Sequence, residues 1–137
     1  MKPLFMLDTN MCIYLMKHQP AEVAARFARY YVGEVVMSAI TLAELEYGVA
    51  CSGDKADVNR RALDLLVEDI PAEPFDGAAA RAYGPARLAV RDRKRDALDK
   101  LIAAHALALD VTLVTNNEAD FAGYPGLKIE NWVSSGS

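Results

Sequence analysis

The chain has 137 residues, 53% hydrophobic and 25% charged, a length and composition that fit one compact domain with its own core. Its 15 basic and 19 acidic residues give a net charge of −4, which excludes a globally basic nucleic-acid-binding protein, and the apolar content excludes intrinsic disorder. No apolar run approaches the ~18 residues of a membrane helix, and no targeting signal is present, so we expect a cytoplasmic protein without membrane contacts. Cys12 and Cys51 are isolated and predict no disulfide framework.

Short apolar strands alternate with helical patterns along the chain. In order, we predict a strand at 4–7, helices at 11–17 and 20–31, a strand at 35–38, helices at 41–52 and 56–70, a short strand at 72–75, helices at 76–88 and 96–109, a strand at 111–115, a helical turn at 118–121 and a strand at 127–130. This alternation predicts an α/β fold with a mostly parallel central sheet and helices on both faces. We assign the domain to residues 1–133 and the small polar residues 134–137 to a frayed C-terminal tail.

Carboxylates lie at the points where ligands bind in such sheets, beyond the carboxyl ends of the strands. Asp8 directly follows the first strand, and Glu44 lies near the start of the helix after the second. Both also have structural interpretations, because Asp8 can cap a helix or form an Asx-turn, and Glu44 completes a capping box with Thr41. Asp99 borders the apolar stripe of its helix, where a carboxylate needs a partner.

The joint placement of these three acids indicates a metal site. Carboxylates that converge on one point repel each other and must be neutralised by a cation. Oxygen ligands select a hard ion such as Mg²⁺ or Mn²⁺, and this ion supports hydrolysis of a phosphodiester. Asp96 is assigned to a different role, a solvated pair with Lys100 four residues along the helix.

Five segments at these strand ends and helix starts form an ordered set of motifs. They are Asp8-Thr9-Asn10, the run 38–48 (SAITLAELEYG), the run 99–106 (DKLIAAHA), the run 113–117 (LVTNN) and the run 125–132 (PGLKIENW). Together they resemble the PIN-domain ribonuclease toxins of the VapC type, and the resemblance covers almost the whole chain. It implies a single PIN-like domain with Mg²⁺, or Mn²⁺ in its place, held by Asp8, Glu44 and Asp99. It further implies an endoribonuclease toxin of a type II toxin–antitoxin pair that cuts structured RNA such as tRNA, forms a homodimer and is neutralised by a VapB-like antitoxin.

The fourth acidic position of the family is open in this sequence. Many PIN domains carry an acid after the fourth strand, where this chain has Asn117. We place Asn117 in the catalytic set because its amide can orient water or metal ligands. Glu118 and Asp120 are the alternatives.

Positive charge is concentrated in residues 81–100, which carry a net charge of +4, whereas the rest of the chain carries −8. Runs of charge are most often solvated surface. This run immediately precedes Asp99, so we hypothesise that it contacts RNA phosphates beside the metal. The residues concerned are Arg91, Arg93, Lys94 and Arg95.

The remaining candidates favour structural roles. His105 lies on the apolar side of its helix and is predicted to be a buried histidine, and Trp132 is predicted to pack against the last strand. Thr115 ends the fourth strand, where a hydroxyl can contact a carboxylate. Four aromatic residues have spacings that suit core or subunit packing, namely Phe27, Tyr30, Tyr31 and Tyr47.

Two other functions compete with the nuclease hypothesis. A haloacid-dehalogenase-like phosphohydrolase also carries its acid after the first strand, but Asn10 stands here where the second Asp of its DxD motif is expected, and no lysine motif is evident. A non-catalytic α/β interaction module would use the same acids only as helix caps, and it predicts no change in melting temperature on addition of metal.

Overall fold

The structure is a computed structural model that describes residues 2–133, and in this range five parallel strands form one sheet in the order β3-β2-β1-β4-β5. The strands are β1 (Phe5–Leu7), β2 (Val35–Ser38), β3 (Ala72–Glu73), β4 (Thr112–Val114) and β5 (Lys128–Glu130). The central strand β1 pairs with β2 and β4, so the carboxyl ends of all three meet at one edge. The predicted parallel sheet is therefore confirmed.

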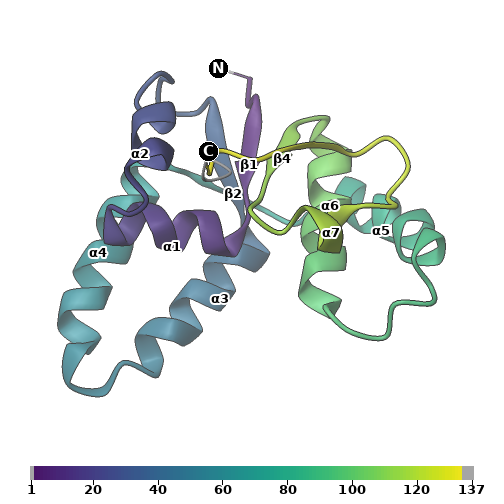
Figure 1. Ribbon diagram of the computed structural model, residues 1–137. Coiled ribbons are helices and arrows are strands. Elements are labelled where there is room, and N and C mark those ends of the chain that lie inside the picture. Colours follow the sequence, from purple (N-terminus) through teal and green to yellow (C-terminus); the bar gives the residue numbers. More distant parts are fainter. Residues whose placement is uncertain (1, 134–137) are drawn as a thin grey trace.

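Helices cover both faces of the sheet (Figure 1). They are α1 (Thr9–Lys17), α2 (Ala21–Phe27), α3 (Ala39–Ala50), α4 (Ala56–Asp69), α5 (Gly77–Ala89), α6 (Ala97–Leu109) and α7 (Glu118–Phe121), with a 3₁₀ turn at Gly53–Lys55 before α4. Helices α1 to α4 lie on one side of β1 in Figure 1, and α5 to α7 lie on the other. No helix within residues 2–133 is both long and apolar enough to span a membrane.

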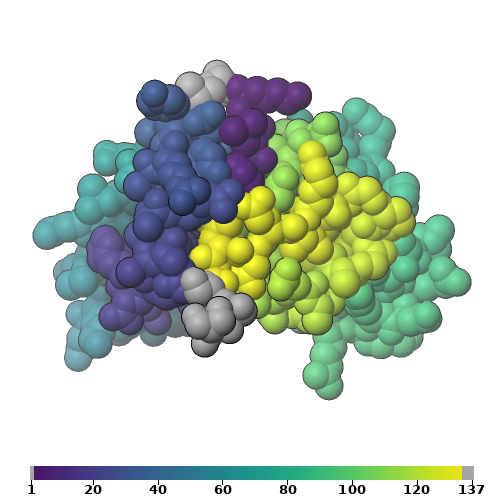
Figure 2. Space-filling view, turned by 45° about the horizontal axis from the view of Figure 1, so that its top comes forward, coloured from purple at the N-terminus to yellow at the C-terminus, as the bar shows by residue number. Residues whose placement is uncertain are grey.

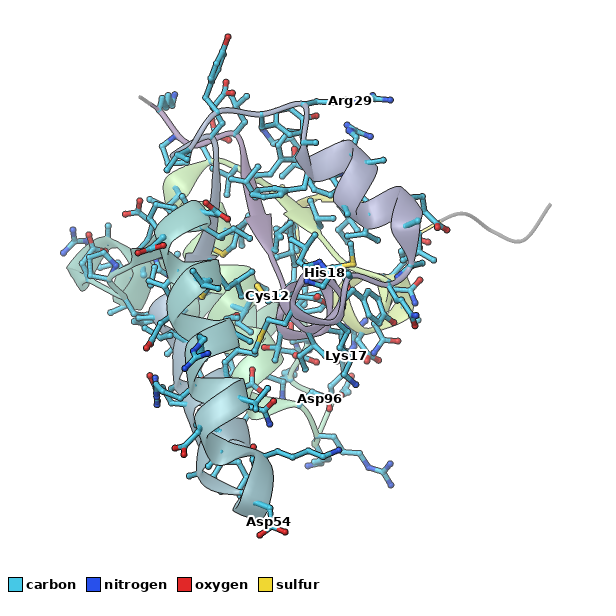
Figure 3. The ribbon with its side chains drawn as sticks, turned by 90° about the vertical axis from the view of Figure 1, so that its left-hand side faces the viewer. Cys12, Lys17, His18, Arg29, Asp54 and Asp96 are labelled. Carbon is cyan, nitrogen blue, oxygen red and sulfur yellow. The ribbon has the colours of Figure 1, made fainter. Side chains whose placement is uncertain are left out.

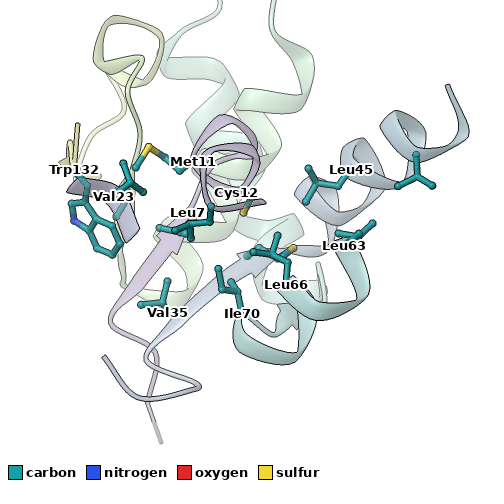
Figure 4. Close-up of a cluster of buried hydrophobic side chains, with 14 residues drawn as sticks. Leu7, Met11, Cys12, Val23, Val35, Leu45, Leu63, Leu66, Ile70 and Trp132 are labelled. Atoms are coloured by element: carbon teal, nitrogen blue, oxygen red, sulfur yellow. The ribbon is translucent and has the colours of Figure 1, made fainter. Parts of the chain in front are cut away.

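Two hydrophobic cores result, because successive residues of a strand point to opposite faces. Leu7 and Met37 belong to the core that α1, α3 and α4 cover, which Figure 4 shows, whereas Met6 and Val36 pack against α5 and α6. Strands buried on both faces explain why these runs are continuously apolar rather than alternating. The assignment of the domain to 1–133 stays a prediction, and the tail 134–137 lies outside the described residues.

The segment after α2 differs from the prediction. The helix ends at Phe27, and the next turn is tightened by a bond from the Tyr30 amide to the Phe27 carbonyl (3.1 Å). This turn directs the Tyr30 ring onto Trp132, with ring centroids 5.8 Å apart, and leaves Tyr31 75% exposed. Figure 2 shows the C-terminal segment, in yellow, lying against this blue N-terminal region. Core packing is thus confirmed for Tyr30 and Trp132, whereas Tyr31 lies outside the core and its subunit packing stays a prediction.

Helix α4 carries leucine on two faces and buries only one of them. Its buried residues are Leu63 and Leu66, whereas Val58 is 70% and Leu65 58% exposed. Helical spacing alone permits either face when both carry leucine, and packing against α1 and α3 selects the side that holds Leu63. Tyr47 of α3 is likewise exposed rather than part of the core.

Candidate metal centre

A cavity of about 170 Å³ opens where β1 and β4 end, and carboxylates dominate its wall. No Lys, Arg or His of the described chain lines this acidic cavity. Its lining residues are Asp8, Thr9, Asn10, Glu44, Asp96, Asp99, Asn117, Asp120 and Phe121. The three acids predicted from the sequence therefore converge, and two further aspartates join them.

Asp8 is held firmly at the end of β1. Its amide donates to the Val114 carbonyl (3.0 Å), and its Oδ1 accepts from the Met11 amide (2.9 Å), which caps α1. The residue is only 5% exposed, and this burial raises its pKa. Hydrogen bonds from Thr115 and Met11 oppose the shift, and the nearby charge of Glu44 adds to it. Asp8 is thus a helix cap that also presents a carboxylate to the cavity.

Glu44 reaches the cavity from the second turn of α3. The Thr9 hydroxyl donates to its Oε1 at 2.6 Å, which orients the carboxylate. The predicted capping box is wrong, because α3 begins earlier and Ser38 caps it, accepting from the Ile40 amide (3.0 Å). Thr41 is instead buried inside the helix, and its hydroxyl has no hydrogen-bond partner among the described residues. Glu44 is therefore free of a capping role.

Asp99 lies in the first turn of α6 and faces two further carboxylates. One oxygen each from Asp96, Asp99 and Asp120 lies within 4.8 Å of the other two. Burial, followed by the charges of Asp96, Asp120, Glu44 and Asp8, raises the pKa of Asp99 to about 7. The carboxyl group consequently holds a proton near neutral pH unless a cation compensates the charge.

The predicted pair between Asp96 and Lys100 is wrong. Asp96 has a left-handed backbone (φ 64°), and its side chain forms no capping bond, so the carboxylate is directed to the acidic cavity. The Lys100 ammonium donates to the Arg93 carbonyl instead. An i,i+4 spacing predicts a pair only when both residues are inside the helix, and Asp96 precedes its first residue.

The candidates for the fourth acidic position are separated by the structure. Asn117 and Asp120 both line the cavity, and Glu118 does not. The backbone N–H of Asn117 donates to the Thr115 hydroxyl (2.9 Å), and this bond fixes the turn between β4 and α7. Asp120 contributes the carboxylate that the sequence offered only as an alternative.

Comparison with known proteins places this geometry in a family. The sequence profile of the PIN domain matches residues 5–127. The chain belongs to the PIN-domain family. A tRNA(fMet)-specific endonuclease VapC from Shigella flexneri is 38% identical over 130 residues, which cover 93% of this chain and 97% of that protein. Ribonuclease VapC2 from Rickettsia felis is 34% identical over 132 residues, 94% of this chain and 98% of that protein.

Solved structures of PIN-domain proteins have the same fold. DNA-bound VapBC from Salmonella typhimurium contains a chain that superposes with a TM-score of 0.87 and 33% identity, covering 96% of this chain and 99% of that one. The resemblance seen in the sequence motifs is therefore confirmed. The PIN-domain match spans residues 5–127 and therefore includes Asp8 and four of the five strands. It removes the haloacid-dehalogenase-like alternative, which rested on the position of Asp8 alone.

The donor set of this PIN domain fits a hard divalent cation. Five carboxylates share one small cavity, and burial together with the charges of the other four raises the pKa of Asp99. Oxygen ligands without any thiolate or imidazole match Mg²⁺ or Mn²⁺ rather than zinc. Asp8 comes from the end of β1 and Glu44 from α3. Asp96 and Asp99 come from the start of α6, and Asp120 comes from α7.

The remaining candidates are placed as follows. His105 is buried, with its Nδ1 2.8 Å from the Ser38 hydroxyl, and burial lowers its pKa, so the prediction of a buried histidine is confirmed. Three residues of the basic run, Arg91, Arg93 and Lys94, line a separate groove, whereas Arg95 is exposed and lines neither the groove nor the cavity.

Proposed function

We propose that this chain is a metal-dependent endoribonuclease and the toxin of a type II toxin–antitoxin pair. The observation that carries the proposal is the acidic cavity at the ends of β1 and β4 in a PIN domain, where five carboxylates converge and no basic side chain of residues 2–133 lines the wall. Relatives of similar length are named as ribonucleases or as a tRNA(fMet)-specific endonuclease, which supports structured RNA, including tRNA, as the substrate.

In the proposed site, Asp8, Glu44 and Asp99 hold Mg²⁺, or Mn²⁺ in its place, and Asn117 belongs to the catalytic set. An ion held by these residues would supply an activated water and would offset the charge on the leaving oxygen of the phosphodiester. The chain's own contribution is positioning. Met11 and Val114 fix Asp8, Thr9 orients Glu44, and the exposed amide of Asn117 is available to orient water at the cavity mouth.

Asp99 links metal binding to proton release. Its pKa of about 7 means that the carboxyl group carries a proton over part of the neutral range. Occupation of the site by a cation removes that proton, because positive charge beside a carboxylate favours its ionised form. Activity is consequently expected to rise with pH through about 7 when metal is limiting.

The partners follow from the relatives. A structure of VapBC from Salmonella typhimurium is among the neighbours, and this supports a VapB-like antitoxin as the inhibitor of this chain. A homodimer and a cytoplasmic location are part of the same proposal. Co-expression with the protein encoded beside this one tests the inhibitor, because growth arrest by the toxin alone must be relieved by its antitoxin.

Cleavage of bulk tRNA with sequencing of the new RNA ends tests the activity. We expect cleavage with Mg²⁺ or Mn²⁺, none with EDTA, and none by Asp8→Asn or Asp99→Asn. Asp92→Asn is the matched control, because Asp92 is exposed and lies outside the acidic cavity. Cleavage by a folded Asp8→Asn, Asp99→Asn double variant would contradict the proposal. Absence of both cleavage and a metal-dependent melting shift would favour the non-catalytic interaction module.

A further inference from the structure

A basic groove of about 500 Å³ lies beside α5 and the N-terminal turn of α6. Besides Gly84 and Leu88, it is lined by five cationic residues, Arg87, Arg91, Arg93, Lys94 and Lys100, and by no acid of the described chain. None of the five forms a salt bridge with a carboxylate within residues 2–133. The groove is therefore a local region of positive charge in a chain with a net charge of −4.

The basic groove and the acidic cavity are lined by neighbouring residues, and Arg93 of the groove donates to the backbone carbonyl of Asp120 in the cavity. Asp99 and Lys100 are consecutive residues of α6, and Asp99 lines the cavity whereas Lys100 lines the groove. The loop before α6 repeats this division, because Lys94 lines the groove and Asp96 the cavity. A polyanion in the groove therefore lies next to the carboxylates that hold the metal.

Two of the five cations are already occupied by the protein itself. Arg93 donates from Nη1 to the carbonyl of Asp120 (3.0 Å), and its guanidinium lies 5.8 Å from the centre of the Tyr124 ring. Lys100 is 8% exposed and donates to the Arg93 carbonyl. The chain of contacts from Lys100 through Arg93 to Asp120 ties the loop and α7 to α6 on the rim of the cavity.

The other three cations, Arg87, Arg91 and Lys94, are exposed. Arg87 donates to the Tyr83 hydroxyl and Arg91 to the Leu88 carbonyl, both at 3.3 Å, so each guanidinium is held near the surface and keeps most of its donors free. Free guanidinium and ammonium donors on an open groove match the oxygens of a phosphodiester backbone.

We infer that the basic groove binds the phosphodiester backbone of RNA through Arg87, Arg91 and Lys94, and that Arg93 is a positioning residue that holds Asp120 beside the metal. The inference rests on the proposed function and divides the basic run into two roles. Arg87 enters the RNA-binding set from α5, and Arg95 leaves it because it lies outside the groove. A local binding surface of this kind offsets the repulsion between RNA and the five carboxylates.

Salt dependence of RNA binding tests the groove. Each lost phosphate contact reduces the slope of log K against log salt by about 0.7, which is about fivefold in affinity at about 0.1 M salt. In the Asp8→Asn background, Arg91→Gln with Lys94→Gln is expected to weaken binding of a fluorescein-labelled single-stranded RNA about 25-fold and to lower the slope by about 1.4. Arg29→Gln is the control, since Figure 3 shows exposed Arg29 near the top of the view and Asp96 well below it, in the lower half. An unchanged slope in the double variant overturns the groove as the RNA site.

For Arg93, we expect a change in the response to Mg²⁺ and no change in the salt dependence of RNA binding. Arg93→Gln, in an otherwise unchanged chain, raises the Mg²⁺ concentration needed for half of the metal-dependent melting shift and lowers kcat. In the Asp8→Asn background it leaves the salt slope of RNA binding within error. Arg93→Lys restores part of the Mg²⁺ response, because an ammonium can still donate to the Asp120 carbonyl. A reduced salt slope together with an unchanged Mg²⁺ response would make Arg93 a phosphate ligand and overturn the division of the basic run into two roles.

If the unmodified chain cuts no RNA, the proposed nuclease function fails, whereas the RNA-binding measurements still decide whether the groove binds RNA.

Discussion

Replacement of Asp99 by Asn separates the stability of the metal site from its function. In the metal-free protein, burial and four neighbouring carboxylates raise the pKa of Asp99 from 3.8 to about 7. The folded state therefore binds the proton more tightly than the unfolded chain does, and stability falls as pH rises between about 4 and 7. Asn has the same shape and no charge, so Asp99→Asn removes this penalty.

The magnitude follows from the pKa change. A pKa raised from 3.8 to about 7 corresponds to about 4 kcal/mol at full effect, and solvent screening of the partly exposed side chain reduces this to about 2 kcal/mol. For a chain of this length, about 2 kcal/mol raises the melting temperature by about 6 °C. In EDTA at pH 8, we expect Asp99→Asn to melt about 6 °C higher than the unmodified protein. At pH 4, we expect the two proteins to melt at the same temperature.

Thermal unfolding with and without Mg²⁺ provides the assay. The unmodified protein gains stability as Mg²⁺ is added, by about 2.7 kcal/mol at a hundredfold excess over the dissociation constant, and the variant gains much less. Asp92→Asn, which changes an exposed acid outside the cavity, should follow the unmodified protein in every condition. The reasoning is refuted if Asp99→Asn melts at or below the unmodified protein in EDTA at pH 8.

Four further substitutions have defined outcomes. Thr9→Val removes the hydroxyl that donates to Glu44, and we expect a lower kcat and weaker Mg²⁺-dependent stabilisation with little loss of helix content by circular dichroism. Ser38→Ala removes both the cap of α3 and the partner of His105, which should cost about 1–3 kcal/mol in urea unfolding. Leu63→Ala empties a fully buried position and should cost about 2–5 kcal/mol, whereas Leu65→Ala, on the exposed side of α4, should cost below about 1 kcal/mol.

The strand ends of the site were predictable, and the loops were not. Asp8 and Glu44 follow buried parallel strands, and the topology of such a sheet brings their positions to one edge. Asp96 lies in a left-handed turn outside its helix, so helical spacing assigned it to the wrong partner. The placement of Asp120 depends on a four-residue helix and a contact with Arg93, 27 residues away in the sequence, and no local pattern encodes that contact.

The position of β1 at the centre of the sheet gives the two halves of the acidic cavity different mechanical support. Asp8 extends from a strand that is paired on both edges, and the amides of Met6 and Leu7 should be among the slowest in the chain to exchange with deuterium. Asp96 and Asp120 depend on a surface loop and one short helix, whose amides should exchange quickly. A cation bound in the acidic cavity therefore lies between a rigid strand and a more mobile loop and short helix. Metal binding should therefore slow hydrogen–deuterium exchange of the backbone amides in residues 91–96 and 117–121 and change exchange in β1 little.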